Sequence, residues 1–123
     1  MTARVLIAED EPHIVESLAF LLRREGYVVI AVGDGEAALA RLRAREQPDL
    51  VILDVMLPLR NGLEVLQAIR GDERLRAIRV MMLTAKAQAH DRAAAEQIGV
   101  DAYVTKPFSN RELLEQVRLL TAG

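Results

Sequence analysis

Residues 49–58 have the sequence DLVILDVMLP, in which an unbroken run of four aliphatic residues is enclosed by two aspartates. This run, residues 50–53, does not alternate between apolar and polar side chains. Such a pattern is typical of a parallel strand that is buried on both faces. Because the run ends at Asp54, the sequence predicts a carboxylate at the end of a buried strand.

Similar short apolar runs recur along the chain, and a longer amphipathic stretch follows each of them. The runs predict strands at residues 5–8, 27–32, 50–53, 80–83 and 102–105. The predicted helices begin near Pro12, Asp34, Asn61, Gln88 and Ser109. A glutamate lies three residues after Asn61 and after Ser109, which is the pattern of a capping box. The first and fourth helices are predicted to end at Gly26 and Gly99, as glycines commonly end helices.

Five strand–helix units in one short chain predict an α/β fold, with a doubly wound, five-stranded parallel sheet and helices on both of its faces. The connections between parallel strands should be right-handed. The chain has 123 residues, of which 51% are hydrophobic and 28% charged, a balance typical of a globular protein. We therefore expect one domain over residues 1–123.

Composition excludes several classes of function. The net charge of -2 offers no electrostatic footprint for nucleic acid, so we expect no direct nucleic-acid binding by this domain. The absence of cysteine excludes disulfides and thiolate metal sites. The first apolar run is interrupted by acids at once, which is unlike a signal peptide or a membrane span. We expect a cytoplasmic protein without membrane attachment.

Polar side chains follow four of the five predicted strands. Glu9 and Asp10 follow the first strand, Asp54 the third, Thr84 the fourth and Lys106 the fifth. Because the carboxyl ends of parallel strands meet at one edge of the sheet, these side chains should lie close together. That edge is where open α/β sheets bind ligands.

These residue types suit phosphoryl chemistry. Crowded carboxylates repel one another, and a hard divalent cation such as Mg²⁺ relieves that repulsion through oxygen ligands. A carboxylate beside such an ion can attack phosphorus and form an aspartyl phosphate. Lys106, one of only two lysines, and the hydroxyl of Thr84 can bind phosphoryl oxygens.

From end to end, the chain resembles the receiver domains of bacterial two-component response regulators. The matching stretches are VLIAEDE (5–11), DLVILDVMLP (49–58), NGLEVLQAIR (61–70), VMMLTA (80–85), GVDAYVTKPF (99–108) and RELL (111–114). The intervals from Asp54 back to Asp10 and onward to Thr84 and Lys106 also resemble those of the family. The resemblance implies a flavodoxin-like (βα)5 fold with strand order 2-1-3-4-5, the order known from chemotaxis receivers.

The resemblance also implies roles for the acidic residues. Asp54 would be the phosphorylated residue, and Asp10 would bind the metal directly. Glu9 would act mainly through water, and Met56 would contribute its backbone carbonyl to the metal. The implied ion is Mg²⁺, with Mn²⁺ as an alternative, and no other cofactor is expected. The family's commonest acidic pair is Asp-Asp, from which Glu9 departs by one methylene.

Three further residues resemble the family's switch. Thr84 would move toward the phosphoryl group, Lys106 would pair with it, and Tyr103 would turn inward on activation. The bond between Lys106 and Pro107 would be a cis peptide. Ala85 keeps the position after Thr84 small, which would leave the site accessible.

The resemblance implies a signalling switch, with Mg²⁺-dependent self-phosphorylation and slow self-dephosphorylation, and not a turnover enzyme. A histidine kinase or a histidine phosphotransfer protein would donate the phosphoryl group. The surface of the fourth helix, fifth strand and fifth helix would then control a downstream protein or output domain. A dehalogenase-like phosphatase would need an acid where Met56 stands, and a nucleotide-binding module would need a glycine-rich loop that is absent here.

Assembly is open at this point, between a monomer and a phosphorylation-dependent dimer. The stretch TKPFSNRELL (105–114) resembles receivers of winged-helix transcription factors, which dimerise through charge pairs. Arg92 and Glu112 would keep one such pair, whereas Ala102 and Gln116 lack another. This loss slightly favours a stand-alone receiver over one from a longer protein. Separately, Met56 and Lys86 flank the expected path of the attacking water, and Met56 has no polar group to orient it, which favours slow self-dephosphorylation.

Overall fold

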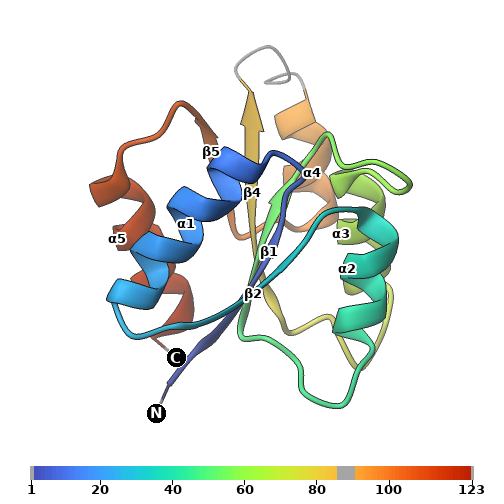
Figure 1. Ribbon diagram of the computed structural model, residues 1–123. Coiled ribbons are helices and arrows are strands. Elements are labelled where there is room, and N and C mark those ends of the chain that lie inside the picture. Colours follow the sequence, from blue (N-terminus) through green and yellow to red (C-terminus); the bar gives the residue numbers. More distant parts are fainter. Residues whose placement is uncertain (1, 86–90, 123) are drawn as a thin grey trace.

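The computed structural model describes residues 2–85 and 91–122, and in them strands and helices alternate along the chain (Figure 1). The strands are β1 (Arg4–Ala8), β2 (Val28–Val32), β3 (Leu50–Asp54), β4 (Arg79–Ala85) and β5 (Ala102–Lys106). The helices are α1 (Pro12–Arg24), α2 (Gly35–Leu42), α3 (Gly62–Arg70), α4 (Arg92–Ile98) and α5 (Asn110–Thr121). No helix in the described part of the chain is both long and apolar enough to cross a membrane.

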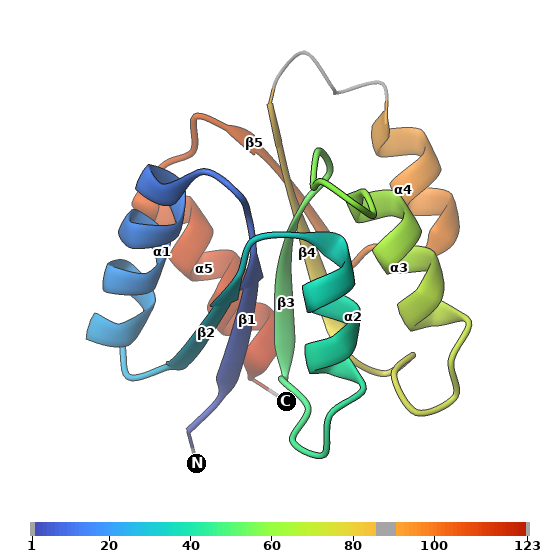
Figure 2. The same cartoon turned by 45° about the vertical axis from the view of Figure 1, so that its right-hand side comes forward.

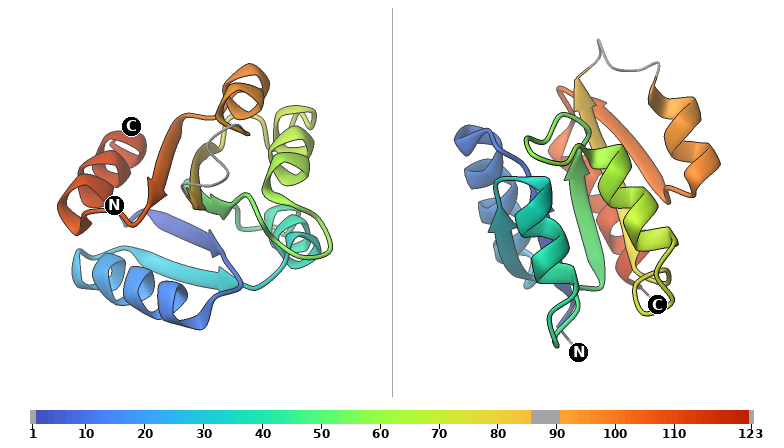
Figure 3. Two further views of the ribbon diagram at one scale, coloured as in Figure 1. Left: turned by 90° about the horizontal axis from the view of Figure 1, so that it is seen from above. Right: turned by 90° about the vertical axis from the view of Figure 1, so that its right-hand side faces the viewer.

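The strands form one parallel sheet in the order β2-β1-β3-β4-β5, which confirms the predicted fold class and strand order. Helices α1 and α5 cover one face, and α2, α3 and α4 cover the other (Figures 2 and 3). Because side chains alternate across a strand, β3 sends Ile52 to the face of α1 and α5 and sends Val51 and Leu53 to the opposite face. Both faces of the central strands are therefore buried, as their unbroken apolar runs predict.

The helix ends follow the predicted capping signals. The Asn61 side chain accepts a hydrogen bond from the backbone N–H of Glu64 at 2.9 Å, and the Glu64 side chain accepts one from the N–H of Asn61 at 3.1 Å. Ser109 accepts a hydrogen bond from the N–H of Glu112 at 3.2 Å, which is the first bond of the predicted second capping box. Gly99 ends α4 in the left-handed conformation, with φ of 118°.

One prediction about element ends was wrong in detail. Asp54, Thr84 and Lys106 do not follow their strands but lie within them, because the ladder continues through Asp54 to Leu83 and through Lys106 to Ala85. The fourth helix was predicted to begin near residue 88. That predicted start lies outside the described residues, in which α4 spans Arg92–Ile98.

Candidate functional site

Three carboxylates meet at the carboxyl edge of the sheet. β1 and β3 are neighbours and pair Ala8 with Leu53, so the residues that follow these two positions lie side by side. Glu9, Asp10 and Asp54 each offer a carboxylate oxygen, and these oxygens all lie within 4.8 Å of one another. Glu9 is 2% exposed and Asp54 is 5% exposed, whereas Asp10 is open to solvent.

Backbone amides hold two of these carboxylates in place. The N–H of Met56 donates to Asp54 Oδ1 at 3.0 Å, and the N–H of Glu11 donates to Glu9 Oε2 at 3.1 Å. Glu9 is anchored further because its own N–H donates to the carbonyl of Val32 at 3.1 Å. Each buried carboxylate therefore keeps one oxygen for the backbone and turns the other toward the shared site.

Among the described residues, Lys106 is the cation that contacts the buried carboxylates. Its Nζ lies 2.7 Å from Glu9 Oε1 and 3.4 Å from Asp54 Oδ2, so it bridges the two buried acids. Burial alone would lower the pKa of Lys106, but the two carboxylates outweigh that effect and raise it. Lys106 is therefore a fixed positive charge beside Asp54.

One lysine does not neutralise three acids. Burial raises the pKa of Glu9 to about 7, and neighbouring Asp54 adds to this effect, although Lys106 opposes it. A raised carboxyl pKa means that the ionised form is disfavoured where it stands. The donor set consists of oxygen atoms only, which are the ligands that hard divalent cations prefer. The residues therefore fit a metal ion that would supply the missing positive charge.

Thr84 on β4 directly follows Leu83, the ladder partner of Asp54, and Tyr103 lies on the neighbouring strand β5. Thr84 is fully buried, and its hydroxyl donates to the carbonyl of Ala85 at 3.3 Å. Burial raises the pKa of Tyr103, and a hydrogen bond with the Thr84 side chain counters part of that effect. The guanidinium of Arg92 on α4 lies 5.4 Å from the centre of the Tyr103 ring. The threonine and tyrosine predicted to act together are therefore in direct contact.

Of the remaining predicted positions, Pro107 and Met56 lie within the described residues. The peptide bond between Lys106 and Pro107 is cis, as the resemblance implied. Met56 lies two residues after Asp54 with a side chain that is 59% exposed. Lys86 lies outside the described residues.

Sequence reasoning missed one residue that shapes the site. Gly62 begins α3 directly against the end of β3, and its N–H donates to the carbonyl of Val55 at 2.8 Å. A Cβ at this position would come within 2.4 Å of the carbonyl oxygen of Asp54. A signal was available, because glycine is a poor helix former and is not favoured at the first position of a helix.

Comparison with known proteins agrees with this geometry. A sequence model of the family described as "Response regulator receiver domain" matches residues 5–118. The alkaline phosphatase synthesis transcriptional regulatory protein PhoP of Bacillus subtilis is 41% identical over 120 residues, which are 98% of this chain and 49% of that protein. The DNA-binding response regulator MtrA of Mycolicibacterium smegmatis is 41% identical over 118 residues, 96% of this chain and 50% of that protein. The chain thus spans about half the length of these curated relatives.

Solved structures match over nearly the whole chain. The receiver domain of the sensor histidine kinase PA1611 of Pseudomonas aeruginosa, with a magnesium ion in its active-site cleft, has a TM-score of 0.86 at 31% identity and covers 100% of both chains. The chemotaxis response regulator CheY4 of Vibrio cholerae has a TM-score of 0.89 at 27% identity, covering 98% of this chain and 99% of that one. With its acidic cluster at the edge of a 2-1-3-4-5 sheet, the chain belongs to the receiver domains of two-component response regulators.

Proposed function

We propose that Asp54 accepts a phosphoryl group from a phosphohistidine of a histidine kinase or a histidine phosphotransfer protein. The observation that carries this proposal is the bridge of Lys106 between Glu9 and Asp54 within a cluster of three carboxylates. The bridge leaves Asp54 oriented by a backbone amide on one oxygen and by an ammonium group on the other. Such fixed donors suit a phosphoryl transfer that depends on positioning and charge.

In the transfer, an oxygen of Asp54 forms a bond to phosphorus while the bond from phosphorus to the donor's nitrogen breaks. The electron pair of that bond stays with the imidazole, which takes up a proton. The ammonium group of Lys106, which contacts the Asp54 carboxylate before the transfer, would then bind the negatively charged phosphoryl oxygens. In hydrolysis, water attacks the phosphorus, and Asp54 is released as a carboxylate together with inorganic phosphate.

Glu9, Asp10 and Asp54, with the backbone carbonyl of Met56, would hold the metal ion, which is Mg²⁺ or alternatively Mn²⁺. When bound, the ion supplies positive charge to the phosphoryl oxygens. The solvent-exposed Asp10 is suited to direct binding, whereas Glu9 is already engaged by Lys106. The magnesium ion in the receiver of PA1611 supports this choice of ion.

The switch would run from Thr84 to Tyr103. The buried Thr84 hydroxyl is bonded within its own strand, so a new phosphoryl group on Asp54 offers it a stronger, charged acceptor. Tyr103 contacts both Thr84 and Arg92 of α4, so movement of the threonine would be transmitted to the surface of α4, β5 and α5. Ala95 is the one fully buried residue of α4, which is therefore lightly packed and easily displaced.

Receiver domains of this family work with histidine kinases and output domains. An apolar groove lined by His13, Ile14, Ser17 and Phe108 opens beside Lys106 and would receive the phosphohistidine-bearing partner. The relatives named above are a transcriptional regulatory protein and a DNA-binding response regulator. The downstream element would be a partner protein or an output domain, and this domain itself would not bind nucleic acid.

The test of the main proposal is an adduct on Asp54. Wild-type protein incubated with Mg²⁺ and acetyl phosphate is expected to gain the mass of one phosphoryl group, and Asp54→Asn is expected to gain none. Intact-mass spectrometry measures both, and beryllofluoride provides a parallel stable adduct. Loss of the adduct in Asp54→Asn with an unchanged melting temperature would place the phosphate on Asp54. An equal adduct in the variant would refute the assignment.

Mg²⁺ is expected to stabilise the wild-type protein. Since an ion that binds only the folded state stabilises by mass action, Mg²⁺ at ten times its dissociation constant should add about 1.4 kcal/mol to the free energy of unfolding. Asp10→Asn should lose most of this gain, whereas Glu115→Gln, an exposed carboxylate of α5, should keep it. Calorimetric melting with and without Mg²⁺ measures the difference, and an equal gain in Asp10→Asn would place the ion elsewhere.

Met56→Asn is expected to speed dephosphorylation. The amide would orient water toward the phosphorus, which Met56 cannot do, and we expect about a 3- to 10-fold faster release, less than a full general base would give. Phosphate release from the preformed adduct measures the rate. Leu59→Asn, on the same loop, is the matched control and should leave the rate unchanged. A wild-type half-life of a few seconds would contradict the slow release that Met56 implies.

A further inference from the structure

α1 exposes an aromatic side chain on its outer face, away from both cores. Phe20 is 67% exposed, although its neighbours Leu21 and Leu22 are buried against the sheet. The guanidinium of Arg24 lies 5.8 Å from the centre of the Phe20 ring. Phe20 plays no part in the carboxylate site, and burial of so large an apolar group would be favourable.

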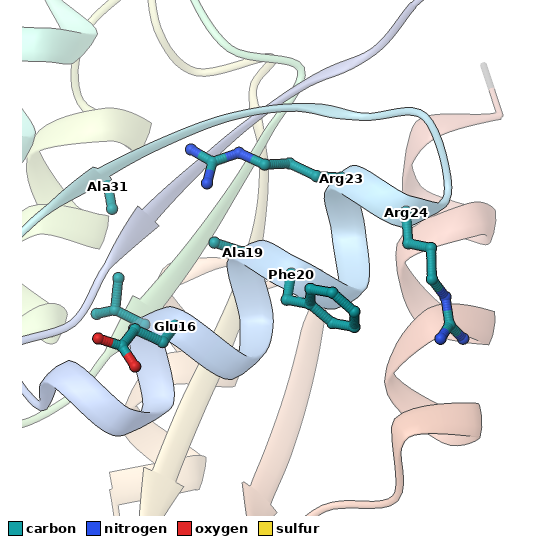
Figure 4. A pocket seen from close by; sticks show the side chains of 7 residues that line it. Glu16, Ala19, Phe20, Arg23, Arg24 and Ala31 are labelled. Atoms are coloured by element: carbon teal, nitrogen blue, oxygen red, sulfur yellow. The ribbon is translucent and has the colours of Figure 1, made fainter.

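A groove lies beside Phe20, between α1 and the edge strand β2 (Figure 4). Its volume is about 560 Å³, and Ala19 of α1 and Ala31 of β2 contribute to its lining. Alanines leave room that larger residues would fill. The groove can therefore accept a bulky side chain, and Phe20 is such a side chain on its rim.

Opposite charges flank Phe20 at equal spacing. Glu16 precedes it by four residues and Arg24 follows it by four, so the three lie along one ridge of the helix. Neither Glu16 nor Arg24 forms an ion pair with another residue in the part of the chain that the structure describes. If two copies of α1 lie antiparallel, the acid of each copy therefore faces the base of the other, with the two aromatic residues between them.

The edge of β2 is protected against strand addition. Arg23 reaches back along β2, and its guanidinium donates to the carbonyl of Val29 at 3.2 Å (Figure 4). A bound strand would need that carbonyl and would have to displace Arg23. A helix is therefore favoured over a strand as the occupant of this face.

We propose that the face made of Glu16, Ala19, Phe20, Arg24 and Ala31 binds a second copy of this chain. The two α1 helices would pack antiparallel about a two-fold axis close to Phe20. Each Phe20 would enter the groove of the other copy, and each Glu16 would meet the other copy's Arg24. Such an interface uses the same patch twice, as two-fold dimers do.

This dimer is separate from the switch surface. β2 and β5 are opposite edges of the sheet, and the groove at β2 is lined by no described residue of α4, β5 or α5. The dimer should therefore form without phosphorylation and should persist in Asp54→Asn. A failed dimer and a failed phosphorylation site are thus distinguishable.

The dissociation constant of the dimer tests the proposal. Sedimentation equilibrium of the unphosphorylated protein should show a monomer–dimer equilibrium, and Phe20→Asp should weaken it by at least about 30-fold, as a central aromatic anchor requires. Leu119→Asp on α5, which replaces an apolar side chain that is 72% exposed, is the matched control and should leave it unchanged. A wild-type protein that stays monomeric at concentrations on the order of 1 mM would overturn the proposal, as would an undiminished dimer in Phe20→Asp.

A charge exchange tests the antiparallel arrangement. Glu16→Arg and Arg24→Glu should each weaken the dimer about 5- to 10-fold, because each places like charges together across the interface. The double variant restores opposite charges and should recover most of the wild-type affinity. Melting curves would verify that each variant is folded. Additive weakening in the double variant would refute the antiparallel pairing.

Discussion

Replacement of Gly62 by alanine is expected to lower the free energy of unfolding by about 3 kcal/mol, through overpacking and loss of a buried hydrogen bond. Urea denaturation at constant pH measures the change, and the melting temperature should fall by about 10 °C for a domain of this size. This loss of stability is large for the addition of one methyl group, because α3 begins in direct contact with the end of β3.

Alanine at position 62 would be destabilising because no space is left for its methyl group between the start of α3 and the end of β3. A Cβ at Gly62 would lie 2.4 Å from the carbonyl oxygen of Asp54 and 2.8 Å from the Cα of Val55. These are backbone atoms of the last residue of β3 and of the buried residue that follows it, and β3 is packed on both faces, so this segment cannot move aside. The start of α3 would have to shift instead, which would break the bond from the N–H of Gly62 to the carbonyl of Val55.

Two other glycines provide controls. Gly33→Ala should change stability by less than about 0.5 kcal/mol, because a Cβ there has no neighbour within 4 Å. Gly35→Ala would meet the carbonyl oxygen of Arg60 at 2.0 Å, but Arg60 belongs to an exposed loop that can yield. We therefore expect alanine to lower the free energy of unfolding most at Gly62, less at Gly35 and least at Gly33. Equal stability of the Gly62 and Gly33 variants would show that α3 can move freely against β3.

Local signals made much of the fold predictable. The run at residues 50–53 is buried on both faces, as an uninterrupted apolar strand should be. Asn61 caps α3 through the reciprocal bonds that its spacing from Glu64 predicts. These features depend on residues close in sequence, or on one strand and its immediate surroundings. They can therefore be inferred without knowledge of the tertiary contacts.

The site was predictable in its membership but not in its pairings. The sequence brings Glu9, Asp10, Asp54 and Lys106 to one edge of the sheet, and the structure confirms that they meet there. It does not indicate that Lys106 lies nearer Glu9 than Asp54, since that depends on side-chain reach. The strand ends were placed too early because a polar residue normally ends a buried apolar run. Here Asp54 and Thr84 are themselves buried parts of the strands.

Other features depend on loops that meet only in the folded chain. Leu59 adopts φ of 67°, a left-handed conformation that leucine disfavours, and nothing in its neighbourhood in the sequence predicts this. The environment of Arg70 likewise depends on segments that meet only in the folded chain. As the last residue of an amphipathic helix it would be expected to point into solvent, yet its side chain is 18% exposed and is surrounded by acceptors.

Arg70→Met is expected to cost about 2 kcal/mol of stability, because it removes several charge-assisted hydrogen bonds while keeping most of the aliphatic side chain. Its guanidinium donates to the carbonyls of Gly99, Arg76 and Ile78 at 2.9, 3.1 and 2.7 Å. It also donates to Asp101 Oδ2 at 2.7 Å. One side chain thus joins the end of α3, the loop before β4 and the turn between α4 and β5. Thermal and urea unfolding measure the loss.

The geometry of the guanidinium, more than its charge, should account for this effect. Lysine keeps the positive charge but cannot direct donors at four acceptors from a planar fork, so Arg70→Lys should lose at least half as much stability as Arg70→Met. Arg74→Met, an exposed arginine of the loop that follows α3, is the matched control and should change little. If charge were decisive, Arg70→Lys would match the wild type and the loss in Arg70→Met would disappear in about 1 M salt, where surface charges are screened. Persistence of the loss in high salt would instead show that Arg70 acts as a structural bridge, fixing the position at which β5 begins.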